Sequence, residues 1–145
     1  MYQRAAALLA SSALALTASA APAIATEKDK YFDLKLTVCK KVIGKDEGKK
    51  FLIKIHTDKG EAKVYLKDKQ CEDVKLKFDK PKVTIKEEDQ HGYKLHKFDV
   101  PMNKHLHTES YKVEDHKVVV KYQDCDNAKV KVIVVNKKDK KDCGC

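Results

Sequence analysis

Apolar and polar residues alternate with a period of two along most of this chain. This is the period of a β-strand with one buried face, because successive side chains of a strand point to opposite sides. After residue 25, no window carries a sustained apolar stripe with the 3.6-residue period of a helix. The alternation predicts strands at residues 32–38, 51–56, 62–67, 74–78, 83–85, 117–122 and 129–135, and less regular strands at 93–100 and 111–113.

Turn-forming residues separate these runs, at 44–48, 58–60, 79–81 and 89–92. The sequence therefore predicts an all-β fold, an antiparallel β-sandwich or barrel of roughly seven to nine short strands. Residues 26–136 would form this single domain, and residues 137–145 a tail rich in Lys and Cys. The runs at 117–122 and 129–135 are apolar at both parities, which predicts central strands covered on both faces.

The first 25 residues have the three parts of a cleavable secretory signal peptide. Arg4 supplies the positive charge, an Ala-rich apolar run extends from Ala5 to Thr17, and small residues offer cleavage after Ala20 or Ala25. The run is shorter than a membrane span requires, and residues 136–145 lack the apolar tail of a GPI signal. We therefore expect a signal helix and a secreted, extracellular product with no membrane span. The alternative is a buried N-terminal helix.

The net positive charge of the chain indicates which kinds of partner to expect. The 31 basic residues against 22 acidic ones give a formal net charge of +9, and removing the signal with Arg4, the single arginine, lowers it to +8. Such a surface attracts polyanions, so the expected partners are an anionic polysaccharide or cell surface, or an acidic protein. Lysine lacks the bidentate fork of arginine and aromatic residues are scattered, so sequence-specific nucleic-acid binding is not expected.

Most of these lysines fall on the polar face of the predicted strands. The residues that we single out for polyanion contact are Lys75, Lys77, Lys129 and Lys131. The alternative is that lysine on exposed and edge strands serves solubility alone, because it blocks edge-to-edge pairing between sheets.

Five cysteines follow the signal, and export to an oxidising compartment favours disulfides among them. The candidates are Cys39, Cys71, Cys125, Cys143 and Cys145. Because five is odd, at least one thiol is free or joins two chains in a disulfide-linked dimer. The sequence leaves the pairing open, with a preference for a bridge that ties the C-terminal Cys-Gly-Cys back onto the domain.

Two groups of residues suggest chemistry. His105 and His107 would share one face of a strand, and His116 could join them as a metal ligand if a hairpin folds there. The alternative is that these histidines are simply solvated. Ser110 has histidines and Asp115 nearby in sequence, but it lacks the G-x-S-x-G turn of a hydrolase nucleophile. We therefore expect no enzyme and no cofactor.

The Ala-rich run and the Ala20-Ala21-Pro22-Ala23 stretch resemble the precursors of small secreted proteins of filamentous fungi. The remaining chain, a short cysteine-containing β domain without a catalytic motif, is similar in kind to the effector-like and allergen-like members of that class. The resemblance implies an extracellular, non-catalytic protein that acts by binding.

Together these features favour a secreted binding protein that adheres to an anionic extracellular surface or partner through a lysine-rich sheet face. One alternative is an effector or inhibitor that recognises a specific protein through its loops. The other is a small metal-binding protein or enzyme.

Overall fold

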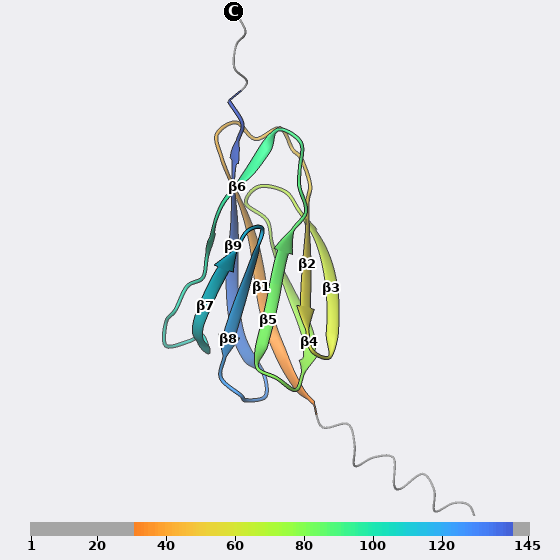
Figure 1. The fold of residues 1–145 in the computed structure, drawn as a ribbon, viewed down its shortest axis with the longest axis vertical. Helices are drawn as coiled ribbons and strands as arrows, with labels where there is room; N and C mark the ends of the chain where they lie inside the picture. The colour runs from red at the N-terminus through yellow and green to blue at the C-terminus, as the bar shows by residue number, and fades with distance from the viewer. Residues whose placement is uncertain (1–30, 141–145) are drawn as a thin grey trace, which may run out of the picture. The chain divides into compact units, whose positions relative to one another are not determined.

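Nine β-strands in two facing sheets make up the computed structural model, which describes residues 31–140 (Figure 1). The predicted signal peptide, Cys143 and Cys145 lie outside the described residues. Within residues 31–140 there is no helix that would span a bilayer. The strands are β1 (Phe32–Ile43), β2 (Phe51–Thr57), β3 (Gly60–Leu66), β4 (Cys71–Phe78), β5 (Lys82–Glu87), β6 (Tyr93–Asp99), β7 (Thr108–Glu114), β8 (Lys117–Tyr122) and β9 (Ala128–Lys138).

The strand order is β4-β1-β9-β6 in one sheet and β3-β2-β5-β8-β7 in the other. This confirms the predicted all-β sandwich and its strand number. All but one of the neighbouring pairs are antiparallel; β1 and β9 run parallel, which the antiparallel prediction did not include. Parallel neighbours need a long crossover connection, and here β2 to β8 together provide it.

The core lies between the sheets and is built from the apolar parity of each strand. On β1, for example, Leu34, Leu36 and Val38 are buried, whereas Lys35 between them is exposed. Aromatic rings are part of this core, and Phe78 and Tyr122 meet edge to face with their centroids 5.0 Å apart. The period-two pattern is therefore a direct consequence of two layers with one interior.

The strands β8 and β9 are interior to their sheets, as predicted, but their outward residues are mostly half-buried or exposed rather than covered; Val135 of β9, at 1% exposure, is the exception. In a two-layer sandwich each sheet packs on its partner with one face only. The outward residues Val119 of β8 and Ile133 of β9 are half-buried, because neighbouring strands of the same sheet flank them on either side. Apolar residues at both parities therefore report an interior position within a sheet rather than a third layer.

The two less regular runs, at 93–100 and 111–113, are the strands β6 and β7, and each contains a register shift. β6 shifts register between Leu95 and Lys97, and β7 between Thr108 and Ser110. An extra residue on one strand displaces all later side chains relative to the partner strand. The loss of clean alternation in these stretches of the sequence follows from that.

One of the predicted disulfides is present. Cys39 of β1 and Cys71 of β4 are directly opposite each other in the antiparallel register and are bonded. Cys125 is half-buried and is not bonded to another cysteine of the described part of the chain. The preferred bridge from the C-terminal Cys-Gly-Cys stays a prediction.

We expect the double variant C39A/C71A to unfold with a free energy lower by roughly 3–4 kcal/mol, because the bridge closes a loop with a sequence separation of 32 residues. Urea denaturation under oxidising conditions measures this. Adding a reductant should lower the wild type to the level of the variant and leave the variant unchanged. Equal stability of the two proteins without reductant would show that the bridge contributes nothing.

Candidate functional site

Besides Thr57, whose hydroxyl donates to the backbone oxygen of Lys77 at 2.6 Å, three polar side chains lie inside the sandwich at positions where the alternation calls for apolar ones. Lys40 is 2% exposed, Glu87 4% and Asn136 1%. Each extends an inner row of its strand, after Val38 on β1, Ile85 on β5 and Val134 on β9. Buried polar groups are costly unless they pair, so their partners define the site.

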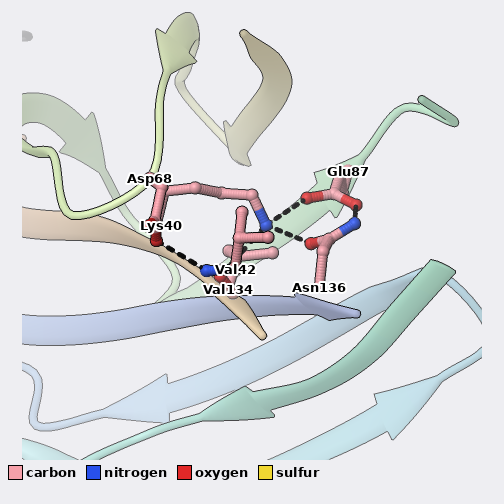
Figure 2. A network of polar contacts seen from close by, with 6 residues as sticks. All are labelled: Lys40, Val42, Asp68, Glu87, Val134 and Asn136. Carbon is pink, nitrogen blue, oxygen red and sulfur yellow. Dashed lines mark hydrogen bonds and ion pairs between the residues drawn. The ribbon is translucent and has the colours of Figure 1, made fainter. Parts of the chain in front are cut away.

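The three side chains contact one another (Figure 2). The amine Nζ of Lys40 donates to the side-chain oxygen Oδ1 of Asn136, and also to the backbone oxygen of Val134 at 3.2 Å. The amide Nδ2 of Asn136 donates to Oε1 of Glu87 at 2.6 Å. The second carboxylate oxygen, Oε2, lies 3.1 Å from Nζ of Lys40 but makes no hydrogen bond within the described residues. Glu87 therefore bridges the amine and the carboxamide.

Strand register brings these residues together. In the parallel pair of β1 and β9, Lys40 is opposite Val134, and Asn136 is two residues further along on the same face. Glu87 comes from β5 in the other sheet and reaches across the interior. The backbone N–H of Lys40 donates to Gln70 at 2.8 Å, which fixes β1 from its other side. The site thus joins both sheets.

Aromatic and aliphatic side chains close the site against water. The ring of Phe51 faces Nζ of Lys40, with 4.2 Å between Nζ and the ring centroid. Phe51 meets Tyr93 edge to face at 5.2 Å, and both pack with Val42 in a small cluster separate from the main core. A cation on an aromatic face is stabilised by the ring quadrupole, so Phe51 both excludes water and holds the amine.

Burial changes the proton affinity of the amine. Desolvation lowers the pKa of Lys40 below that of an exposed lysine, and the negative charge of Glu87 opposes this shift in part. The lowered pKa means that Lys40 gives up its proton more readily than a surface lysine. A deprotonated amine is a nucleophile, and here it lies against a carboxamide.

The sequence carries a weak signal for this site. Lys40, Glu87 and Asn136 each occupy the apolar parity of a strand, directly after a buried aliphatic residue of that parity. Glu87 and Asn136 lie at or near a strand end, where polar residues are ordinary, whereas Lys40 interrupts a row that continues with the buried Val42. Only the strand register shows that the three side chains are in contact.

The histidines of the predicted metal site are not brought together. His105 and His107 precede β7 at one end of the β7–β8 hairpin, and His116 lies in its turn at the other end. The ring Nδ1 of His107 accepts a hydrogen bond from the backbone N–H of Lys129 at 2.8 Å, so this nitrogen is bonded to the beginning of β9. Within residues 31–140, no cluster of three or more His, Cys, Asp or Glu is placed to hold a metal ion.

Ser110 has no triad geometry. It lies on β7 opposite Lys121, and Asp115 is in the turn after that strand. Five residues of extended strand separate Ser110 from Asp115 by roughly 16 Å. Their nearness in sequence therefore does not become nearness in space.

The four lysines singled out for polyanion contact share the outer face of the four-stranded sheet. Lys75 of β4 and Lys129 of β9 are both directly opposite Lys35 of β1. Asp33 partly neutralises this face, because its carboxylate lies 2.8 Å from Nζ of Lys77 and 3.5 Å from that of Lys75. The pKa of Asp33 is lowered, first by the hydrogen bond from Lys77. A polyanion would compete with Asp33 for these two lysines.

Comparisons with known proteins place the fold. No protein-family model and no curated protein matches the chain. Among solved structures it is similar to a bacterial adhesin from Mobiluncus mulieris that contains intramolecular disulfide, isopeptide and ester bond cross-links. Two crystal forms of that adhesin give TM-scores of 0.51 and 0.52 at 19% and 20% identity, covering 73% of this chain and 41% of the adhesin chain.

A mutant of the major pilin from Streptococcus pyogenes is a more distant match, with a TM-score of 0.35 at 17% identity over 74% of this chain and 48% of the pilin. The chain thus spans less than half the length of either neighbour. The resemblance to secreted fungal proteins stays a prediction, because none of these matches bears on it. What the comparison establishes is the fold: a β-sandwich of the kind found in an adhesin.

Proposed function

We propose that this chain is a secreted, non-catalytic adhesion protein whose sandwich closes an isopeptide bond between Lys40 and Asn136, with Glu87 as proton carrier. The observation that carries the proposal is the contact between the Lys40 amine and the Asn136 carboxamide, bridged by Glu87 in a dry interior. A buried ion pair by itself is weak evidence of a stabilising role. An amine, an amide and a carboxylate in mutual contact have a reaction available to them.

The reaction is an amide exchange. Lys40 loses a proton, and the nitrogen lone pair attacks Cγ of Asn136. A bond forms between Nζ and Cγ, the bond between Cγ and Nδ2 breaks, and Nδ2 leaves as ammonia. Amine and primary amide become secondary amide and ammonia, so the step needs no oxidant, reductant or other reagent.

Glu87 is suited to move the proton that this exchange requires. Its Oε2 is 3.1 Å from Nζ, which must lose a proton, and its Oε1 is 2.6 Å from Nδ2, which must gain one. A carboxyl group at hydrogen-bonding distance from both atoms serves first as base and then as acid. The position of Glu87 is therefore matched to both halves of the step.

The interior favours this exchange over hydrolysis. Fixing the two reacting groups in contact replaces a bimolecular encounter by an intramolecular one. Phe51 and the cluster with Tyr93 exclude the water that would otherwise hydrolyse the carboxamide of Asn136. Each chain would react once with itself, which is self-modification rather than turnover.

The position of the bond suits a protein that bears mechanical tension between its two ends. Lys40 is on the first strand and Asn136 on the last, with a sequence separation of 96 residues. A bond there carries tension from β1 directly to β9, so β2 to β8 stay folded. The Mobiluncus mulieris adhesin is a cross-linked protein of the same fold, which supports a role in adhesion. The lysine-rich surface would supply contact with an anionic extracellular surface.

The first prediction of this proposal concerns the mass of the protein. Wild-type protein should be lighter than its sequence, with the disulfide counted, by the mass of one ammonia molecule. The variants K40A, N136A and E87Q should show the full sequence mass, because each removes the nucleophile, the amide or the proton carrier. Intact-mass spectrometry gives the answer, and digestion should yield one branched peptide that contains both Lys40 and Asn136.

The matched control is K41A, which changes the neighbouring exposed lysine of β1. It should lose ammonia as the wild type does. Full sequence mass in freshly folded and in aged wild-type protein would refute the cross-link. So would ammonia loss in E87Q at the wild-type rate, because Glu87 would then have no part in the reaction.

The second prediction separates the bond from the buried charge. K40M should be less stable than wild type, since it loses both the cross-link and the cation that pairs with Glu87. K40M/E87Q also lacks the cross-link, but a neutral amide replaces the unpaired carboxylate. We therefore expect the double variant to be more stable than K40M by at least about 1 kcal/mol in urea denaturation. If it is no more stable, Glu87 is not a buried charge that depends on Lys40.

A further inference from the structure

The outer face of the five-stranded sheet carries four lysines in a single row, one on each of four neighbouring strands. The cross-strand partners are Lys63 of β3 and Lys54 of β2, then Lys54 and Lys86 of β5, then Lys86 and Lys117 of β8. We call these four residues the lysine row. Adjacent strands are about 4.8 Å apart, so the row is roughly 14 Å long.

Such a row is unfavourable without a partner. Like charges directly opposite on neighbouring strands destabilise a sheet. Lys54 forms an ion pair with Glu88 at 2.8 Å, and Lys117 a longer one with Glu114 at 3.6 Å. Lys63 and Lys86 form none within the described part of the chain. The row thus keeps a net positive charge along its length.

The carboxyl groups that pair with lysines of the row respond to this charge. The pKa of Glu88 is lowered, first by its hydrogen bond from Lys54. The pKa of Glu114 is lowered as well, by Lys112 and then by Lys117. Neighbouring lysines in the row are closer together than the screening length of about 8 Å at physiological ionic strength. Their fields therefore add, and a linear anion would meet a continuous positive track.

The same face offers a hollow and an exposed aromatic ring. The hollow has a volume of about 700 Å³ and is lined by all four lysines of the row and by one carboxylate, that of Glu61. Tyr65 is two residues from Lys63 on the same face of β3, opposite the half-buried Leu52, and is 59% exposed. An aromatic ring beside a charged track is suited to a ligand with both apolar ring faces and charges. Sugars with carboxylate groups are of that kind.

We infer that the lysine row binds a linear acidic polysaccharide that lies across the strands, with its carboxylates on the four lysines and a sugar ring against Tyr65. The inference rests on the proposed adhesive function and names its ligand class and its face. It is independent of the Lys40–Asn136 bond. Lysines bind carboxylates as point charges, and the exposed ring of Tyr65 favours a polyanion that is built of sugars.

The test compares two quadruple variants of equal charge. One replaces the lysine row, K54Q/K63Q/K86Q/K117Q. The other replaces the four lysines of the opposite outer face that the sequence singled out for polyanion contact, K75Q/K77Q/K129Q/K131Q, where Asp33 already pairs with Lys75 and Lys77, so the two variants decide between the two faces. Each lowers the net charge by the same amount. Calorimetry with a short oligomer of galacturonic acid should show at least about tenfold weaker binding by the row variant. The opposite-face variant should stay close to wild type.

Two further comparisons identify the ligand class. The same oligomer with its carboxylates methyl-esterified should not bind. Y65A should bind the acid oligomer several-fold more weakly, but inorganic polyphosphate as wild type does, because polyphosphate has no sugar ring to stack. The wild-type affinity should fall as salt rises, with a shallower slope in the row variant.

Equal losses of affinity in the two quadruple variants would overturn the inference, because binding would then depend on the total charge of the protein and not on the lysine row. Tighter binding of wild type to single-stranded nucleic acid or anionic vesicles than to the acid oligomer would also overturn it, as would no binding to the oligomer. Circular dichroism and the urea midpoint of every variant serve as the check on folding, and loss of ammonia is measured alongside. If the wild type lacks both ammonia loss and binding to any anionic matrix, the proposed function itself has failed.

Discussion

A charged amine inside a β-sandwich must find partners, and this requirement organises the end of the fold around Lys40. Removing an ammonium group from water is costly unless hydrogen bonds and an opposite charge replace the solvent. The partners come from three directions: Val134 and Asn136 on β9, Glu87 on β5 and the ring of Phe51 on β2. Lys40 and Asn136 belong to one sheet, and Glu87 and Phe51 to the other, so the pairing links the two sheets.

The parallel pairing of β1 and β9 follows the same logic. An antiparallel meander would place the first and last strands wherever the hairpins lead, often on opposite edges. Here β9 returns to lie between β1 and β6, and Asn136 comes within reach of Lys40 only because the two strands run in the same direction in this register. Burial of Leu34, Leu36 and Val38 on the same face of β1 stabilises the pairing along its full length.

Most of the fold could be read from the sequence, whereas the site could not. Alternation reports which residues face inward on each strand, and this gave the class, the strand number and most strand positions. It says nothing about which strands are neighbours, so neither the parallel pair nor the meeting of Lys40, Glu87 and Asn136 was accessible. Because alternation carries no information on register, the prediction of a metal site failed for the same reason. His107 and His116 are close in sequence but lie at opposite ends of one hairpin.

Two consecutive residues of β1, Cys39 and Lys40, make different contacts because alternation turns them to opposite faces of the sheet. Cys39 and Lys40 necessarily point to opposite sides of the strand. Cys39 is bonded to Cys71 on β4, and Lys40 reaches across β9 to Asn136. The strand β1 is therefore held to both of its neighbours at the same level, once through each face. Lys40, on the inward parity, is held in contact with Glu87 and Asn136, whereas its outward neighbours Lys35 and Lys41 are exposed. A shift of β1 by one residue would turn Cys39 inward and Lys40 outward, and both contacts would be lost.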